Sequence, residues 1–255
     1  KYEHAIAKGK ATFSPLRTSG GEFHALLLLS ITGVMLLCEA RDLIWLFLAL
    51  ELVSLPTYVM VAMSRLSKVA QEAAMKYFVL GALASGILLY AMSLLYGLTG
   101  TLELAGIRQS VSGFSADDLP LAVALILVIV GLLFKLGAVP FHMWVPDVYA
   151  GSPTSVTAYL ASAPKIAAFV IVLRLLATSL EPLIEVWQEM LIVVALLSIG
   201  FGNLVAIAQT NLKRMLAYST ISHMGFFLLG ILSGDSVGYS AAMLYAVIYA
   251  VTSLG

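Results

Sequence analysis

The sequence is poor in charge and almost without cysteine. Only 11% of its 255 residues are charged, and its one cysteine, Cys38, lies in an apolar run. A single cysteine excludes an intrachain disulfide and the multi-cysteine sites that hold iron–sulfur clusters. Basic and acidic residues balance at 14 each, with no basic tract. The charge pattern therefore gives no reason to expect a nucleic-acid partner.

Apolar residues dominate instead. They make up 61% of the chain, and the mean hydropathy is +1.00. Stretches of about 20 apolar residues, enough to cross a bilayer, recur along the sequence. We therefore expect an all-α integral membrane protein with about eight transmembrane helices. Their approximate bounds are 22–39, 43–64, 72–98, 119–146, 153–177, 183–208, 212–233 and 237–255.

The two ends of the sequence differ. Lys1 to Gly21 is polar and lacks the apolar centre of a signal peptide, so we expect residues 1–21 to be a cytoplasmic loop segment. The last residues lie inside an apolar run, which indicates a piece of a longer membrane protein. Capping side chains are expected at Asp42, at Asp118 and at Ser152, each just before an expected span.

Basic residues in the expected loops favour one face of the membrane. One face would carry Lys1, Lys8, Lys10, Arg17, Arg65, Lys68, Lys76, Lys213 and Arg214, and the other only Arg41, Arg108 and Arg174. By the positive-inside rule, the first face is cytoplasmic.

Four titratable residues fit no loop. With a rise of about 1.5 Å per residue, Glu51 lies roughly 13 Å and Lys135 about 24 Å from the outer ends of their helices. Lys165 and His223 each lie roughly 18 Å from the cytoplasmic ends of theirs. All four therefore share the middle of the bilayer, where ionisable groups are costly and functional by default.

Lys135 is followed by a predicted helix break. The stretch GLLFKLGAVPFHMWVPDVYAGSPTSVT interrupts its apolar run with Gly137 and Pro140, so we expect a discontinuous helix near Gly137–Pro140. Irregular backbone at membrane depth persists only where it is buried in protein or lines a wet cavity. Transporters place their binding sites at such breaks.

Glu51 and Lys135 together can carry a proton. A lysine in hydrocarbon tends to lose its proton, whereas a nearby carboxylate keeps it charged, so changing their separation releases or takes up a proton. Lys165 would be the next acceptor, and His223 could continue the relay. Structural roles stay open: an ion-pair clamp for Glu51 and Lys135, a packing contact for Lys165, and a hydrogen-bonded packing residue for His223.

Other residues receive simpler interpretations. Lys76, Lys213 and Arg214 are expected to be anchors at the cytoplasmic surface, and Asp147 to have a loop or cap role. His142, in the broken segment, either lines a cavity or packs. Interfacial positions are expected for Trp45, Trp144, Tyr149 and Trp187.

A faint internal repeat is also present. Arg41-Asp42-Leu43 aligns with Thr210-Asn211-Leu212 at an offset of 169, and the two spans that follow are expected to run in opposite directions. Oppositely oriented copies are typical of inverted-repeat transporters, although a match this short also occurs by chance. On this alignment Glu51 corresponds to Thr220.

Longer stretches resemble subunit N of bacterial respiratory complex I, in the antiporter-like membrane subunit family of NADH:quinone oxidoreductase. They are FLALELVSLPTYVMVA, EAAMKYFVLGALASGILLYAMSLLYG, FKLGAVPFHMWVPDVYAGSPTSV, SAPKIA and GNLVAIAQTNLKRMLAYSTISHMGF. The resemblance covers almost everything from Glu22 to Gly255. The block PFHMWVPDVYAGSPT separates the chain from the sister subunits L and M.

The resemblance implies a fold of about fourteen helices with two inverted five-helix repeats, each containing one broken helix. Residues 22–179 would form the first repeat with its proton half-channel, and residues 180–255 the incomplete start of the second. The family's relay residues map onto Glu51, Lys135, Lys165 and His223. A further lysine, on the second broken helix, would lie beyond Gly255.

The resemblance also implies a function. The chain would be a proton-translocating subunit that couples quinone reduction to proton pumping through the mid-membrane Glu/Lys relay. It would carry no redox centre, cofactor or metal itself; NADH, FMN, iron–sulfur clusters and quinone would belong to the whole complex. Its partners would be the other antiporter-like and small membrane subunits and the lipid bilayer, and no nucleic acid would bind. The chain would lie in the bacterial cell inner membrane as a multi-pass protein. The alternatives are a subunit of a cation/proton antiporter or of a membrane-bound hydrogenase, and a purely structural membrane scaffold.

Overall fold

The computed structural model describes residues 20–114 and 118–254. The expected loop segment 1–21 lies outside the described residues, apart from Gly20 and Gly21, which open the first described helix. The described residues form helices and contain no strand beyond an isolated bridge between Asp42 and Glu103. The elements are α3 (Gly20–Glu39), α4 (Leu43–Ala62), α5 (Lys68–Thr99), α6 (Leu104–Val111), α7 (Leu119–Leu136), α8 (Trp144–Gly151), α9 (Thr154–Ala161), α10 (Ala163–Val172), η1 (Leu173–Ser179), η2 (Glu181–Leu183), α11 (Ile184–Ile207), α12 (Leu212–Leu232) and α13 (Ser236–Thr252).

Most of these helices are built to cross a membrane. Within the described residues, 7 helical segments are long and apolar enough to span a bilayer, and α13 is a shorter apolar helix. The expected all-α membrane architecture is confirmed, and the expected eight spans correspond to these seven segments plus α13. The short helix α6, in the expected loop after α5, was not predicted.

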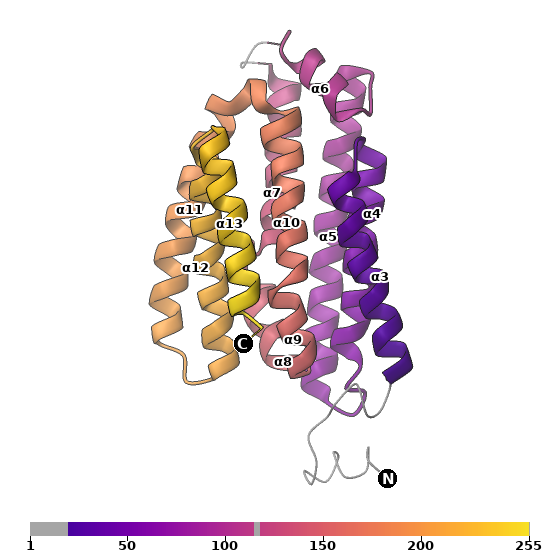
Figure 1. Cartoon of the computed structure of the whole chain (residues 1–255), viewed down its shortest axis with the longest axis vertical. Coiled ribbons are helices and arrows are strands. Elements are labelled where there is room, and N and C mark those ends of the chain that lie inside the picture. Colours follow the sequence, from indigo (N-terminus) through magenta and orange to yellow (C-terminus); the bar gives the residue numbers. More distant parts are fainter. Residues whose placement is uncertain (1–19, 115–117, 255) are drawn as a thin grey trace.

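The helices form an elongated bundle with a central pair (Figure 1). Helices α3, α4 and α5 lie on one side, α11, α12 and α13 on the other, with α7 and α10 between them. Helix α10 packs against α3, α4, α7 and α13, and α8 packs against both α5 and α12. The short helices α8 and α9 lie at the same end of the bundle as the described start of α3, and α6 lies at the opposite end.

The predicted break after Lys135 is confirmed. Helix α7 ends at Leu136 because Gly137 adopts the left-handed conformation, φ 76°, and its N–H bonds back to the carbonyls of Leu133 and Phe134. A side chain there would be strained, and its Cβ would lie 2.6 Å from Cγ2 of Val145. The backbone N–H of Val139 is satisfied by Oγ of Ser198 at 3.0 Å. The chain resumes helical structure at Trp144, so the span expected to reach residue 146 is two helices.

A second break was not predicted. The span expected over 153–177 divides at Ser162, whose backbone (φ −113°, ψ −90°) is not helical. Pro164 follows in the first turn of α10, where its missing N–H costs nothing, so sequence alone does not mark it as a breaker. Lys165 is therefore the third residue of a new helix, close to irregular backbone.

The expected helix caps are partly confirmed. Asp42 accepts a hydrogen bond from the N–H of Trp45 at 2.7 Å, and Asp118 accepts one from Leu121 at 3.5 Å. The expected Ser152 cap is wrong, because Pro153 is the cap position of α9 and the Ser152 hydroxyl pairs with Thr157 instead.

Close helix packing falls at two equivalent places. A Cβ on Gly33 of α3 would lie 2.7 Å from the backbone nitrogen of Val53 in α4. A Cβ on Gly202 of α11 would lie 2.7 Å from the backbone nitrogen of Ser222 in α12. In a bilayer, such small-residue contacts let helices approach and associate, because lipid is as apolar as the core. Both members of the second pair follow those of the first by the same 169 positions.

The buried apolar residues form two clusters, and α4 and α5 pass from one to the other. On α4 the first cluster ends at Val53 and the second begins at Tyr58. On α5 the second ends at Ala84 and the first begins at Leu88. The polar residues described next occupy this junction.

Candidate functional site

Glu51 and Lys135 meet at the junction of the two apolar clusters. The Lys135 Nζ lies 3.4 Å from Oε1 of Glu51, and the two side chains are 9% and 20% exposed. They come from α4 and from the last turn of α7, and 84 positions separate them in the sequence. The structure thus brings together the pair that depth along the helices had suggested.

Two serines complete the environment of Lys135. Its ammonium donates to Oγ of Ser85 at 2.9 Å and to Oγ of Ser54 at 3.0 Å. With Glu51 as the third acceptor, all three ammonium hydrogens have a partner. The Ser54 hydroxyl in turn donates to the carbonyl of Leu50 at 2.9 Å. A buried charge is stable only when its hydrogen bonds are satisfied in this way.

Ser85 also links the pair from the side. Its hydroxyl accepts from Lys135 and donates to Oε1 of Glu51 at 2.5 Å. A hydroxyl that accepts from one group and donates to the other is a two-step path along which a proton can move. Sequence reasoning missed both serines. Ser54 had a usable signal, since it lies three residues after Glu51 on the same helix face. Ser85 had none beyond its place in a small-residue stretch.

Lys165 lies at the other side of the helix break. It is 2% exposed, and its Nζ donates to the carbonyl of Leu136 at 2.6 Å, at the C-terminal end of α7. A cation there satisfies a carbonyl that the break has freed and complements the helix dipole. Leu136 is the residue after Lys135, so the two lysines are joined through one peptide unit. Within the described residues, no hydrogen bond joins Lys165 directly to Lys135 or to His223.

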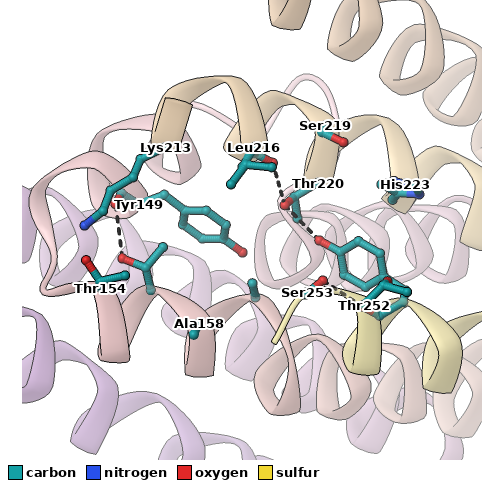
Figure 2. Close-up of a pocket in the computed structure, with 13 residues that line it drawn as sticks. Tyr149, Thr154, Ala158, Lys213, Leu216, Ser219, Thr220, His223, Thr252 and Ser253 are labelled. Carbon is teal, nitrogen blue, oxygen red and sulfur yellow. Dashed lines mark hydrogen bonds between the residues drawn. The ribbon is translucent and has the colours of Figure 1, made fainter. Parts of the chain in front are cut away.

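His223 lies apart from Glu51 and Lys135 and lines a cavity (Figure 2). The cavity measures about 270 Å³ and lies between α8, α9, α12 and α13. Lys213 lines it near the start of α12, and Thr220 and His223 line it near the middle of that helix. His223 Nδ1 is 2.6 Å from the hydroxyl of Tyr245, and Tyr249 donates to Thr220 at 2.8 Å. His223 is therefore hydrogen-bonded, as expected for a packing residue, and it also lines the cavity.

An ion-pair cluster ties α8 to both of its neighbours. Asp147 pairs with Lys76 of α5 at 2.8 Å and with Arg214 of α12, and Lys76 also pairs with Glu72 at 2.8 Å. The simple anchor and loop roles expected for these residues are incomplete, because the break lets α8 dock between α5 and α12. Burial raises the pKa of Asp147, but its hydrogen bonds from Lys76 and Arg214 outweigh burial and hold the pKa below its usual value.

Comparison with known proteins agrees with this architecture. Residues 40–255 match the family described as NADH:quinone oxidoreductase/Mrp antiporter, transmembrane. The chain belongs to this family. It is a multi-pass membrane protein, and the regions that carry Glu51, Lys135, Lys165 and His223 all fall inside the matched residues.

Two bacterial relatives show how much of the protein this chain represents. The chain is 55% identical over 235 residues to NADH-quinone oxidoreductase subunit N of Thiobacillus denitrificans, covering 92% of this chain and 49% of the relative. It is 52% identical over 258 residues to the subunit N of an Azoarcus species, covering 98% of this chain and 52% of the relative. The chain thus spans about half the length of the curated relatives it matches.

Solved structures place the same fold in several complexes. A chain of respiratory complex I from Thermus thermophilus matches with a TM-score of 0.78 at 37% identity, over 98% of this chain and 52% of that one. A chain of the Mrp complex from Dietzia sp. matches with a TM-score of 0.81 at 28% identity, over 90% of this chain and 42% of that one. A chain of an archaeal membrane-bound sulfane sulfur reductase matches with a TM-score of 0.78 at 31% identity, over 91% of this chain and 47% of that one.

Metal binding finds no support in the part of the chain that the structure describes. No group of three or more His, Cys, Asp or Glu residues there is arranged to hold a metal ion. Of the four candidate residues, Glu51, Lys135 and His223 each hydrogen-bond to a hydroxyl, whereas Lys165 bonds to a backbone carbonyl.

Proposed function

We propose that this chain is a proton-translocating membrane subunit of an NADH:quinone oxidoreductase, and that Glu51, Lys135, Lys165 and His223 carry the proton. The observation that carries the proposal is the satisfied ammonium of Lys135, held by Glu51, Ser54 and Ser85 directly before a helix break. A purely structural helix contact needs no buried charge with a movable partner, and such charges are expensive within a membrane.

The first step is a change in the separation of Glu51 and Lys135. In the arrangement described, Lys135 keeps its proton because Glu51 and the serines stabilise the ammonium. If Glu51 moves away, the ammonium remains buried without an opposite charge, and desolvation then favours loss of the proton. The break at Gly137 and Pro140 allows the two halves of the helix to move separately and gives Lys135 access to protons from the cytoplasm.

Lys165 is the next acceptor. It binds the carbonyl of Leu136, beside Lys135, so a proton released by Lys135 has a short distance to cover inside the bundle. His223 follows further along the membrane, in the cavity bounded by α12 and α13. Within the described residues, these last two groups are not hydrogen-bonded to each other, so water or movement must complete the path.

We also infer two inverted repeats, with residues 22–179 as the first and 180–255 as the start of the second. Three features support this at the same offset of 169: the capping residues Asp42 and Asn211, the N–H groups of Trp45 and Arg214 that they bind, and the close glycine contacts of α3 with α4 and of α11 with α12. On this alignment Thr220 takes the place of Glu51, and His223 that of Ser54. Both line the 270 Å³ cavity.

Sequence identity favours a subunit of an oxidoreductase over a subunit of an antiporter. Two relatives named as subunit N are 55% identical to the chain, whereas the matched chain of the Mrp complex is 28% identical. The whole assembly would therefore lie in the bacterial inner membrane, with NADH, FMN, iron–sulfur clusters and quinone bound by other subunits. The partners of this chain would be other antiporter-like and small membrane subunits. A subunit of a cation/proton antiporter is the second candidate, because the fold and the described site suit either.

Two measurements test the proposal. Affinity purification of the tagged full-length chain from its membranes should recover flavin and iron–sulfur subunits; recovery with cation-antiporter subunits alone would favour the second candidate. Replacing Glu51 by Gln should sharply lower proton translocation per NADH oxidised in membrane vesicles while the complex stays assembled. Glu189→Gln, at an exposed position on α11, is the matched control and should leave that ratio unchanged.

A further inference from the structure

Trp144 occupies a position that none of the steps above uses. It is the first residue of α8, directly after the break, and only 4% of it is exposed. An interfacial position was expected for it, but the indole lies inside the bundle, as do the side chains of Tyr149 and Trp187.

The indole lies face-on to Lys165. The Lys165 Nζ is 4.9 Å from the centre of the Trp144 ring. Tryptophan gives the strongest cation–π interactions, and these are worth most where the cation has lost its water. Within the described residues, Lys165 forms no ion pair with a carboxylate. The ring face and the carbonyl of Leu136 are thus the groups in contact that favour its charged form.

The indole N–H binds the same helix end. Trp144 Nε1 donates to the carbonyl of Phe134 at 3.0 Å, while Lys165 donates to that of Leu136 at 2.6 Å. These carbonyls belong to the residues on either side of Lys135. Trp144 and Lys165 therefore bind the backbone carbonyls of the two residues that flank Lys135, so a movement of Lys135 would displace the hydrogen-bond partners of both.

The ring is fixed by further aromatic contacts. It stacks on Tyr77 of α5, with centroids 4.7 Å apart and planes at 15°, and on Phe134 of α7, with centroids 6.1 Å apart and planes at 26°. A ring held from two helices cannot follow Lys165 independently. It fixes where the ammonium is stabilised.

We propose that Trp144 is a positioning residue for proton transfer to Lys165, whose protonated form it stabilises through its ring face at the end of α7. This inference rests on the proposed function, because it concerns the step from Lys135 to Lys165. It assigns to Trp144 a role beyond filling space: to make Lys165 a competent proton acceptor when Lys135 releases its proton.

Substitutions can distinguish a role of the Trp144 ring face from a role in packing alone. In the full-length chain within its complex, Trp144→Phe keeps an aromatic face, whereas Trp144→Leu keeps an apolar side chain without one. Trp187→Leu is the matched control, because Trp187 is 0% exposed and donates its Nε1 hydrogen to the carbonyl of Leu180 at 2.9 Å. The readout is the number of protons translocated per NADH oxidised in membrane vesicles. This ratio reports only on assembled complex, so a loss of assembly alone does not change it.

We expect Trp144→Leu to lower this ratio severalfold, Trp144→Phe to lower it less, and Trp187→Leu to leave it unchanged. An unchanged ratio for Trp144→Leu in assembled complex would overturn the inference, as would equal losses for the Leu and Phe variants. If Lys165→Met also left the ratio unchanged, the proposed relay itself would be wrong. If Lys165→Met lowered the ratio and Trp144→Leu did not, only the role of Trp144 would be wrong.

If the complex with Trp144→Leu fails to assemble, fluorinated tryptophan at position 144 provides a second test. Fluorine atoms withdraw charge from the ring face and weaken the cation–π contact with little change in shape. The pumping ratio should fall progressively as more fluorine atoms are added. A ratio independent of fluorination would show that Trp144 only fills space.

Discussion

The Ser85 hydroxyl donates to Glu51 at 2.5 Å, so a serine on α5 fixes the carboxylate of α4. The same hydroxyl accepts a hydrogen bond from Lys135 at 2.9 Å. One small side chain therefore sets the geometry of the Glu51–Lys135 pair and provides a path between its members. A lysine and a glutamate at the same membrane depth are not enough; the hydroxyls around them decide how the charges are held.

Ser85→Ala should impair proton translocation more than assembly. The change removes one acceptor from Lys135 and one donor to Glu51 in a buried site, a cost of about 1–3 kcal/mol. About 1.4 kcal/mol is a tenfold change in rate. We expect proton translocation in membrane vesicles to fall about tenfold. Ser93→Ala, at an exposed position on the same helix, is the control; equal effects of the two changes would contradict this role for Ser85.

Gly137→Ala should destabilise the break. The left-handed backbone at φ 76° costs a side-chain-bearing residue about 1–2 kcal/mol. The new Cβ would also lie 2.6 Å from Val145 Cγ2 and 3.3 Å from Nζ of Lys165. Thermal unfolding of the purified full-length protein should show a lower midpoint for Gly137→Ala. Gly200→Ala, whose Cβ would meet nothing within 4 Å, should show no loss, and similar midpoints for both variants would contradict the account of the break.

Asp147→Asn should loosen α8 from α5 and α12. It weakens the ion pairs with Lys76 and Arg214, and such partly exposed pairs contribute little because solvent screens them. The midpoint of thermal unfolding should fall by a small amount. Lys76→Ala should lower it less, because Arg214 still binds Asp147. A larger loss for Lys76→Ala than for Asp147→Asn would show that Glu72, not Asp147, is the main partner of Lys76.

The effect of Asp147→Asn should depend on pH. Because the pKa of Asp147 in the folded protein lies below its usual value, the ion pairs stabilise the fold above the ordinary carboxyl pKa of about 3.9 and are lost as pH falls through the folded-state value. The difference in unfolding midpoint between the native protein and Asp147→Asn should therefore be constant from neutral pH to about pH 5 and vanish only in stronger acid. A difference that disappeared between pH 7 and pH 6 would point to a histidine instead.

Some of this site could be predicted from the sequence, and the reasons are physical. Charges inside apolar runs are rare, so Glu51, Lys135 and Lys165 stood out, and the helical rise put them at one depth. Gly137 and Pro140 marked the break because few other residues end a helix so clearly. Ser85 could not be found, since serine is common in membrane helices and only the packing of α5 against α7 brings it to Lys135. Trp144 was misplaced because its position depends on where the chain turns after the break.

The most direct test of the relay is the pumping ratio of Lys135→Met. Methionine has a similar length and no charge, so the helix packing is kept while the titrating group is lost. Protons translocated per NADH oxidised should fall sharply in vesicles that contain assembled complex, whereas Lys68→Met, at the exposed start of α5, should behave like the native protein. An unchanged ratio for Lys135→Met would contradict the central claim that Lys135 carries the proton.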